Sequence, residues 1–203
     1  MKLLIIDMGM GNIHSVVKAV AHCGASPLLL SKPQEISEPY KIILPGVGAF
    51  SDAAKNLKQS GWWDFLSTEV PRQKIPLLGI CLGMQLLADV SYEGKETKGL
   101  GLIPGEVKKL KFDTDYPVPH IGWNEVVFQE HHPIFNDIPS SKDFYFVHSY
   151  HFEAKQNTSC FAKTEYGNEF CSVVTRELIT GVQFHPEKSG LYGLKLLKNF
   201  ILC

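Results

Sequence analysis

Short apolar runs alternate with segments of helical spacing through the first half of the chain, and this alternation limits the possible folds more than any other feature. The apolar runs cover residues 3–7, 27–30, 41–44 and 77–80, and the segments of helical spacing include 13–23 and about 51–66. Strands that are apolar along their whole length are typical of a parallel sheet that is covered by helices. We therefore predict an α/β fold with a central, largely parallel sheet and helices on both faces.

The second half of the chain has a different pattern, because polar and apolar residues alternate there. Between Gly105 and about Val182, the runs typical of antiparallel strands are GEVKKLKF, EVVFQ, FYFVHSYHFEA and CSVVTR. We expect these strands to be attached to the first sheet, and we expect the last segment, GLYGLKLLKNFIL, to form a helix. The sequence contains no internal repeat and no Pro/Gly/Ser-rich linker, so we predict a single domain over residues 1–203.

The charge balance argues against binding to nucleic acids or to membranes. The formal net charge is −1, and the sequence offers no basic stripe that would neutralise phosphates or anionic lipids. The N-terminal apolar run ends at Asp7, so it is too short for the core of a signal peptide or for a membrane span. We therefore expect a cytosolic protein.

The five cysteines follow no pattern of a disulfide framework or a zinc site. They are an odd number, and they lack CxxC or Cys/His ligand spacing. We expect most of them to be small core residues and expect no metal site.

One cysteine lies in a sequence context that favours catalysis. Gly79-Ile80-Cys81-Leu82-Gly83 joins an apolar strand to a helix, which is the arrangement of a nucleophile elbow with sulfur in place of oxygen. The two glycines permit a tight turn at the carboxyl edge of the sheet, and the helix N-terminus favours a thiolate. A buried structural cysteine is the common alternative, but the flanking glycines and the helix make Cys81 a candidate nucleophile.

A thiolate nucleophile needs a base that a third group orients, and His185-Pro186-Glu187 offers both. The apolar run that precedes His185 places it at a strand end, and the rigid Pro186 lets Glu187 turn back to the imidazole. Other histidines compete for this role, although each alone is more typical of a surface or structural position: His14, His120, His131, His132, His148 and His151.

Two glycine-rich segments follow apolar strands. In PGVGAF, residues 45–50, Gly46 and Gly48 permit main-chain N–H groups to approach a substrate, as an oxyanion hole requires. A plain turn between a strand and a helix would have the same sequence. The other segment, DMGMGN, contains Gly9 and Gly11 but has His14 at the third glycine position of a dinucleotide site, so we discount cofactor binding there.

These motifs together resemble the class I, or triad-type, glutamine amidotransferases, whose fold is flavodoxin-like. More narrowly, the sequence is similar to the glutaminase subunit of imidazole glycerol phosphate synthase. The resemblance covers nearly the whole chain and rests on the order of seven motifs: DMGMGN, PGVGAF, LGICLGMQLL, GLGLIPGEV, PHIGWNEV, YFVHSY and GVQFHPEKS.

The resemblance implies a role for each residue that matches a family motif. Cys81 would attack the side-chain amide of glutamine, His185 would transfer the proton, and Glu187 would orient His185. The oxyanion would be bound by backbone N–H groups of Leu82 and of the segment that contains Val47 and Gly48. The residues implied to bind glutamine are Gly48, Gln85, Glu93, His148, Ser149 and Tyr150, and those implied to face a partner are Pro119, Trp123, Asn124, Tyr145 and Lys188.

The resemblance also implies a heterodimer with a (β/α)8-barrel cyclase that receives the ammonia, and it implies no cofactor. Met8 and Tyr92 depart from the family pattern. They leave open a paralogue that supplies ammonia for amidine formation on a bacterial surface sugar. A cysteine peptidase and a non-catalytic binding subunit are alternatives from other functional classes.

Overall fold

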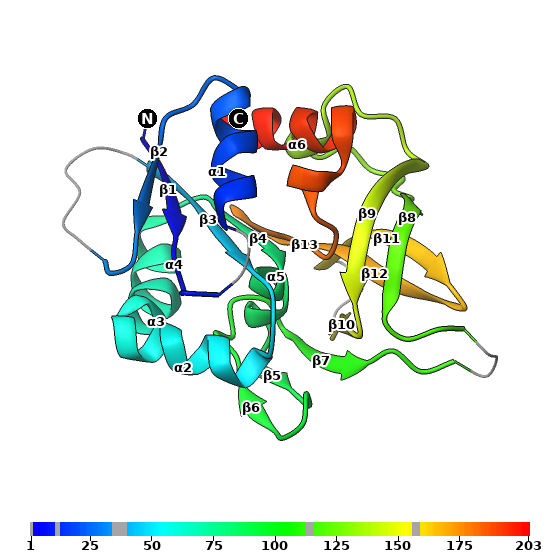
Figure 1. Cartoon of the computed structure of the whole chain (residues 1–203), viewed down its shortest axis with the longest axis horizontal. Coiled ribbons are helices and arrows are strands. Elements are labelled where there is room, and N and C mark those ends of the chain that lie inside the picture. Colours follow the sequence, from blue (N-terminus) through cyan, green and yellow to red (C-terminus); the bar gives the residue numbers. More distant parts are fainter. Residues whose placement is uncertain (1, 11–12, 34–39, 113–115, 156–158) are drawn as a thin grey trace.

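The computed structural model describes residues 2–10, 13–33, 40–112, 116–155 and 159–203, and it contains a central seven-stranded sheet (Figure 1). From one edge to the other, the strands are β11 (Cys160–Tyr166), β12 (Asn168–Arg176), β13 (Ile179–Val182), β4 (Leu77–Cys81), β3 (Tyr40–Gly46), β1 (Lys2–Ile6) and β2 (Pro27–Leu30). The last five are parallel, whereas β11 and β12 are antiparallel additions at one edge. The predicted largely parallel sheet is therefore confirmed.

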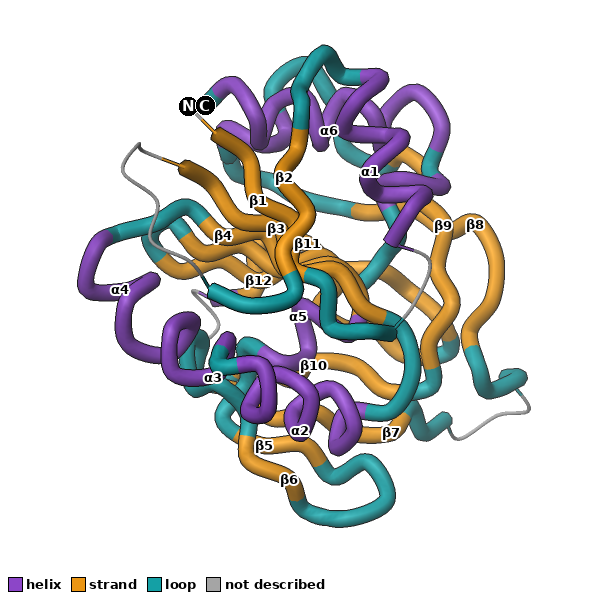
Figure 2. Tube along the Cα trace, turned by 60° about the vertical axis from the view of Figure 1, so that its left-hand side comes forward, coloured by secondary structure: helices purple, strands orange, loops and turns teal. Residues whose placement is uncertain are grey.

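Helices cover both faces of this sheet, as the apolar strands predict (Figure 2). One face packs against α1 (Ile13–His22) and α6 (Gly190–Leu202), and the other packs against α2 (Phe50–Ser60) and the helical turns that follow it. Neighbouring residues on β1 point to opposite faces of the sheet. Ile5 packs in the core next to α1 and α6, and Ile6 packs in the core next to α2.

The helix expected at about 51–66 is wrong as a single element. Gly61 adopts a φ of 85° and ends α2, and a series of short turns continues the chain. These turns are α3 (Trp62–Asp64), a π-helical turn (Phe65–Glu69) and α4 (Val70–Gln73). The helices expected at 13–23 and 190–202 are confirmed, and Gly24 follows the first with a φ of 86°.

The antiparallel strands attach to the first sheet only in part. The expectation holds for β11 and β12, but four strands form a second sheet in the order β10 (Tyr150–Ala154), β7 (Gly105–Lys109), β5 (Val90–Ser91) and β6 (Thr97–Lys98). A separate two-stranded sheet pairs β8 (His120–Val126) with β9 (Lys142–His148), and we call it the ribbon. The run FYFVHSYHFEA is therefore not one strand, because the chain leaves the ribbon at Ser149 and enters the second sheet at Tyr150.

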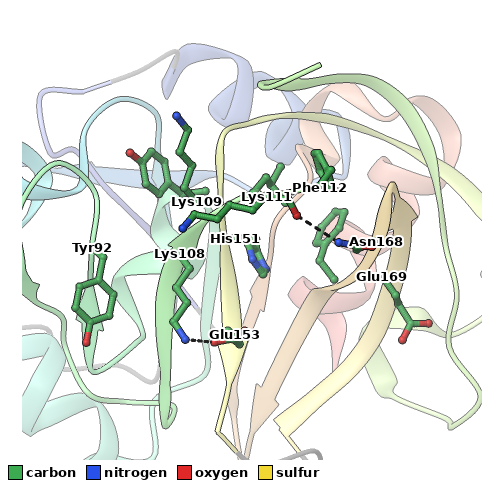
Figure 3. A pocket seen from close by; sticks show the side chains of 12 residues that line it. Tyr92, Lys108, Lys109, Lys111, Phe112, His151, Glu153, Asn168 and Glu169 are labelled. Atoms are coloured by element: carbon green, nitrogen blue, oxygen red, sulfur yellow. Dashed lines mark hydrogen bonds and ion pairs between the residues drawn. The ribbon is translucent and has the colours of Figure 1, made fainter. Parts of the chain in front are cut away.

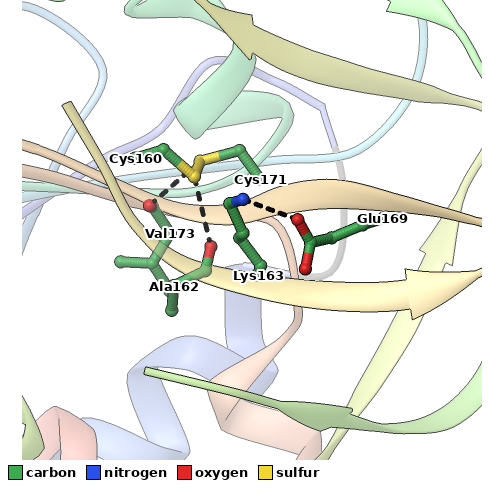
Figure 4. Close-up of a disulfide and its surroundings, with 6 residues drawn as sticks. All are labelled: Cys160, Ala162, Lys163, Glu169, Cys171 and Val173. Atoms are coloured by element: carbon green, nitrogen blue, oxygen red, sulfur yellow. Dashed lines mark hydrogen bonds and ion pairs between the residues drawn. A yellow bond between two sulfur atoms is a disulfide. The ribbon is translucent and has the colours of Figure 1, made fainter. Parts of the chain in front are cut away.

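A disulfide joins Cys160 on β11 to Cys171 on β12, which corrects the expectation of unpaired cysteines (Figure 4). The two strands are antiparallel neighbours, so residues 11 positions apart in sequence have Cα atoms 5.7 Å apart. Sequence spacing does not reveal this pairing, because it depends on a strand register that is shifted by irregularities next to Ala162.

Among the described residues, no helix is both long enough and apolar enough to cross a membrane.

The turn from β4 into α5 (Leu82–Leu86) leaves no room for side chains at its two glycines. A Cβ atom on Gly79 would lie 2.7 Å from the carbonyl oxygen of Gly83, and one on Gly83 would lie 1.7 Å from the carbonyl oxygen of Leu44. Both obstacles are backbone atoms, which cannot move away as a flexible side chain can. Helix α5 is thereby held directly against β3.

We expect Gly83→Ala to lower the free energy of unfolding by about 3 kcal/mol or more, because the added methyl group would have to separate α5 from β3. Gly24→Ala is the matched control: Gly24 has open space around it, so only its positive φ opposes a side chain, at a cost of about 1 kcal/mol. Urea denaturation of the two variants measures the difference. Equal losses would show that the close approach at Gly83 relaxes without cost.

Candidate active site

Cys81 lies at the carboxyl end of β4, where the strand turns sharply into α5. Its backbone has a φ of 53° and a ψ of −107°, a conformation that residues other than glycine rarely adopt. In the register of the sheet, Cys81 is paired with Gly46 at the end of β3. The sheet therefore places the thiol beside the glycine-rich segment that the sequence singles out.

His185 and Glu187 come from the strand on the other side of Cys81. His185 follows β13, and a 3-10 turn (Pro186–Lys188) directs Glu187 back toward it. The imidazole Nδ1 lies 2.8 Å from Oε1 of Glu187, and the two side chains are only 3% and 4% exposed. The carboxylate accepts the Nδ1 proton, which leaves Nε2 as the free nitrogen of the ring.

The surroundings of His185 favour its protonated form. Burial lowers the pKa of His185, but the Cys81 sulfur and the Glu187 carboxylate outweigh that effect and raise the pKa to about 10. His185 Nε2 is buried without a hydrogen bond to any of the described residues. An imidazolium in this position stabilises a neighbouring thiolate and can later protonate a leaving group.

A pocket of about 340 Å³ lies beside Cys81. This pocket is lined by Cys81, Pro119 and Val147 and by every residue that the resemblance assigns to glutamine or to the oxyanion. The assigned residues are Val47, Gly48, Leu82, Gln85, Glu93, His148, Ser149 and Tyr150. The structure thus brings together residues that are more than a hundred positions apart in sequence.

The main chain determines the position of one pocket residue, Glu93, and the residue type at another, Gly48. Oε2 of Glu93 accepts a hydrogen bond of 2.7 Å from the N–H of Phe50, the first residue of α2. Gly48 has a φ of 108°, and a Cβ atom there would lie 2.8 Å from Cε of Met10. Only glycine fits at position 48 without strain, which keeps the main chain of this segment accessible to the pocket.

The residues predicted to face a partner gather mainly on the ribbon. Trp123 on β8 is 57% exposed and lies opposite Tyr145 on β9, with 6.1 Å between ring centroids. Nζ of Lys188 lies 5.7 Å from the centroid of the Tyr145 ring. Pro119 reaches the pocket itself, whereas Asn124 donates a hydrogen bond of 2.8 Å to the carbonyl oxygen of Glu165.

Sequence reasoning missed Ser189, which connects His185 to the ribbon by hydrogen bonds. Its hydroxyl accepts a hydrogen bond of 3.0 Å from the Tyr145 N–H and donates one of 2.6 Å to the His185 carbonyl oxygen. The His185 N–H in turn donates to the Tyr145 carbonyl oxygen at 2.8 Å. The place of Ser189 at the end of the GVQFHPEKS motif was the available signal.

A larger hollow of about 620 Å³ lies along β7, β10 and β12 (Figure 3). Three lysines line it, Lys108, Lys109 and Lys111, and Lys108 forms an ion pair with Glu153. Its lining contains no cysteine, whereas Cys81 lines the smaller pocket. Among the described residues, no group of three or more His, Cys, Asp or Glu side chains could hold a metal ion.

Two further histidines are buried at the base of the ribbon. His120 and His148 are paired across β8 and β9, and Nδ1 of His120 lies 3.0 Å from Nε2 of His148. Burial lowers the pKa of His120 to about 4 and that of His148 to about 3. Both rings are therefore neutral at pH 7.

We expect Cys81→Gly to be more stable than Cys81→Ala by about 1 kcal/mol, because glycine relieves the strain at a φ of 53°. At Cys23, which directly follows α1 without a positive φ, the order should be reversed, because glycine loses more conformational entropy on folding than alanine does. Thermal or urea unfolding of the four variants measures both differences. The same order at both positions would contradict backbone strain at Cys81.

The buried histidines predict a loss of stability in acid. The pKa values of His120 and His148 lie below the ordinary value of 6.5, so the unfolded chain takes up protons that the folded chain does not. Their contribution is fully present above pH 6.5 and is lost as the pH falls toward about 3. His120→Phe should make the slope of unfolding free energy between pH 6 and 5 shallower by about 1 kcal/mol per pH unit. An unaltered slope in His120→Phe would count against a neutral His120.

The comparisons with known proteins agree with this geometry. Residues 4–203 match the family described as Glutamine amidotransferase class-I. Imidazole glycerol phosphate synthase subunit HisH 2 of Methanococcus maripaludis is 44% identical over 199 residues, covering 98% of each chain. Subunit HisH of Moorella thermoacetica is 48% identical over 198 residues, covering 98% of this chain and 93% of the relative.

Solved structures support the fold at much lower identity. A structure described as a glutamine amidotransferase has a TM-score of 0.73 at 17% identity, with 98% of this chain and 97% of that chain covered. PurLQS from Thermotoga maritima has a TM-score of 0.71 at 14% identity, covering 99% and 97%. With a family match over nearly the whole length, the chain belongs to the class-I glutamine amidotransferases and, among them, to the group of imidazole glycerol phosphate synthase HisH subunits.

Proposed function

We propose that this chain, acting as one domain over residues 1–203 in the cytoplasm, hydrolyses glutamine and supplies the ammonia to an imidazole glycerol phosphate synthase. The observation that carries this proposal is the position of Cys81 between a buried His185–Glu187 pair and a pocket that is lined by the expected glutamine-binding residues. A peptidase is disfavoured, because the pocket of about 340 Å³ suits a single amino acid better than an extended peptide.

The Cys81 thiolate attacks the side-chain amide carbon of glutamine and forms a C–S bond. Backbone N–H groups of Leu82 and of the Val47–Gly48 segment, after a peptide rearrangement, bind the oxyanion. His185 then protonates the amide nitrogen, the C–N bond breaks, and ammonia leaves a glutamyl thioester. Water, deprotonated by His185, hydrolyses the thioester, so that glutamate is released and the electron pair of the C–S bond returns to sulfur.

The ribbon is the proposed docking surface for a (β/α)8-barrel cyclase in a heterodimer. It carries exposed apolar side chains, with Trp123 at 57% and Ile121 at 59% exposure, and it forms one wall of the pocket through Val147 and His148. A partner that covers this wall would receive ammonia without loss to solvent. The relatives named as HisH subunits, at 44% to 48% identity, support the synthase assignment.

We further propose that partner binding is coupled to the glycine-rich segment, where Gly46 and Gly48 permit backbone arrangements that other residues do not. The partner's ligand would favour the arrangement of Val47 and Gly48 that binds the oxyanion, so the isolated chain should turn over glutamine slowly.

The proposed function is tested by measuring glutamate release from glutamine with and without the histidine-pathway cyclase and its phosphoribulosyl substrate. We expect strong stimulation by the partner with its ligand, no activity in Cys81→Ala, and a loss in kcat of about a thousandfold or more in Glu187→Gln, because Glu187 orients His185. The exposed Glu130→Gln serves as the control and should behave as the parent. High activity of the isolated chain that no partner alters would contradict the coupling.

The second candidate acceptor is an enzyme other than the histidine-pathway cyclase, and the observation behind it is that relatives bear numbered names such as HisH 1 of Campylobacter jejuni and HisH 2 of Vibrio vulnificus. A paralogue that supplies amidine formation on a surface sugar would retain the Cys81 chemistry. Glutaminase activity without association to the histidine-pathway cyclase would favour that acceptor.

A further inference from the structure

Gln183 contacts the nucleophile, although no step described above uses it. It follows directly after β13, at the level of Cys81 in the neighbouring strand, and its side chain is fully buried. Its Nε2 atom lies 3.6 Å from the Sγ atom of Cys81, which is hydrogen-bonding distance for sulfur.

The hydrogen bonds of Gln85 determine which end of the Gln183 amide faces the sulfur. Nε2 of Gln85 donates one hydrogen bond of 2.9 Å to the carbonyl oxygen of Tyr150, which can only accept. Its second hydrogen bond, of 3.1 Å, goes to Oε1 of Gln183. Because Oε1 is occupied as an acceptor, the NH2 group of Gln183 must point to Cys81.

The same carbonyl oxygen fixes the proton positions on the two buried histidines. Nδ1 of His148 lies 2.8 Å from the Tyr150 carbonyl oxygen, so Nδ1 carries the proton and Nε2 of the neutral ring is an acceptor. The contact of 3.0 Å then requires that Nδ1 of His120 donates to Nε2 of His148. The remaining nitrogen of His120 accepts from Nδ2 of Asn124 at 3.3 Å.

The His120 ring and the Asn124 amide, which lie at the ribbon end of this series of hydrogen bonds, are each held by further contacts. The His120 ring stacks on Tyr166, with centroids 3.9 Å apart, and on Phe146, with centroids 4.9 Å apart. The Asn124 amide donates to the carbonyl oxygen of Glu165 and accepts from the N–H of Glu125, so its orientation is also determined.

The sulfur also lies near a group that favours its protonated form. The carbonyl oxygen of Val147 lies 3.9 Å from Sγ of Cys81 and can accept the proton of a thiol. A carbonyl oxygen favours the protonated form of Cys81, whereas an amide NH2 group favours the thiolate. The direction of the Gln183 amide therefore affects which form of the sulfur is preferred.

We propose that Gln183 is a further catalytic residue, whose NH2 group donates a hydrogen bond to the Cys81 thiolate. A series of hydrogen bonds holds the Gln183 amide in this orientation, and it runs from Asn124 through His120, His148, the Tyr150 carbonyl oxygen and Gln85. The role of Gln183 in glutamine hydrolysis rests on the proposed function. There it stabilises sulfur before the attack and again when the C–S bond of the thioester breaks and the electron pair returns to sulfur.

The direct test is the rate of Cys81 alkylation by iodoacetamide between pH 5 and 10, with the other thiols quantified by mass spectrometry. Gln183→Glu keeps an acceptor for Gln85 but replaces the donor by a carboxylate, and we expect it to slow alkylation at pH 7 at least tenfold and to move the profile to higher pH. Gln183→Met, which only removes the donor, should slow it about threefold. Ser172→Ala is the matched control, since Ser172 is buried on the neighbouring strand and its carbonyl oxygen binds the Gln183 N–H. Profiles for both Gln183 variants that superimpose on the parent would overturn the proposal.

The role of the histidines as positioning residues is tested by a double-mutant cycle on the same rate. His120→Phe preserves the ring stacking and removes both hydrogen bonds, so it should slow alkylation about twofold in the parent and have no effect in Gln183→Met. Equal effects of His120→Phe in both backgrounds would show that it acts independently of Gln183 and would overturn the positioning role.

Alkylation needs neither glutamine nor a partner, so its outcome is separate from that of the glutaminase assay. The expected alkylation profiles together with no glutamate release would refute the proposed function but leave the Gln183 contact established. Normal partner-stimulated glutamate release with unchanged alkylation profiles would do the opposite.

Discussion

The close approach of α5 to β3 determines the geometry of everything at the carboxyl edge of the sheet. With no side chain at Gly83, the first turn of α5 packs against the Leu44 carbonyl, and Cys81 is held in its unusual backbone conformation. Cys81, the proposed nucleophile, is thereby fixed between β3, which supplies the glycine-rich segment, and β13, which leads to His185. Hydrophobic packing on both faces of the sheet supplies the free energy that maintains this strained turn.

The ribbon joins the pocket to the protein surface. One strand contributes His148 to the pocket wall, while the other presents Trp123 to solvent, and the pairing of the two strands makes them a single mechanical unit. A partner bound to Trp123 would therefore contact an element that is hydrogen-bonded to the triad through Tyr145 and His185. For a partner that docks as proposed, this arrangement would connect docking with the proposed active site without a large movement of the central sheet.

The sequence alone predicted the features that depend on local patterns. Apolar strands predicted the parallel sheet. The HPE motif predicted the contact between His185 and Glu187, because these residues are close in sequence and follow the end of a strand. Features that depend on register between distant strands could not be predicted in this way. The pairing of Cys160 with Cys171 and the separation of β9 from β10 at Ser149 belong to this class. The series of turns after α2 was missed because Gly61, a single residue within an otherwise helical pattern, ends that helix.

The two glycines of the elbow also limit how a protein of this kind can evolve. Since backbone atoms occupy the space beside both glycines, a side chain at residue 79 or 83 would have to displace the main chain, so we expect few substitutions to be tolerated there. The ribbon has no comparable restriction at its exposed positions, such as Ile121 and Trp123. If a partner docks on the ribbon as proposed, substitutions at these exposed positions would change the recipient of the ammonia and leave the turn that holds Cys81 undisturbed.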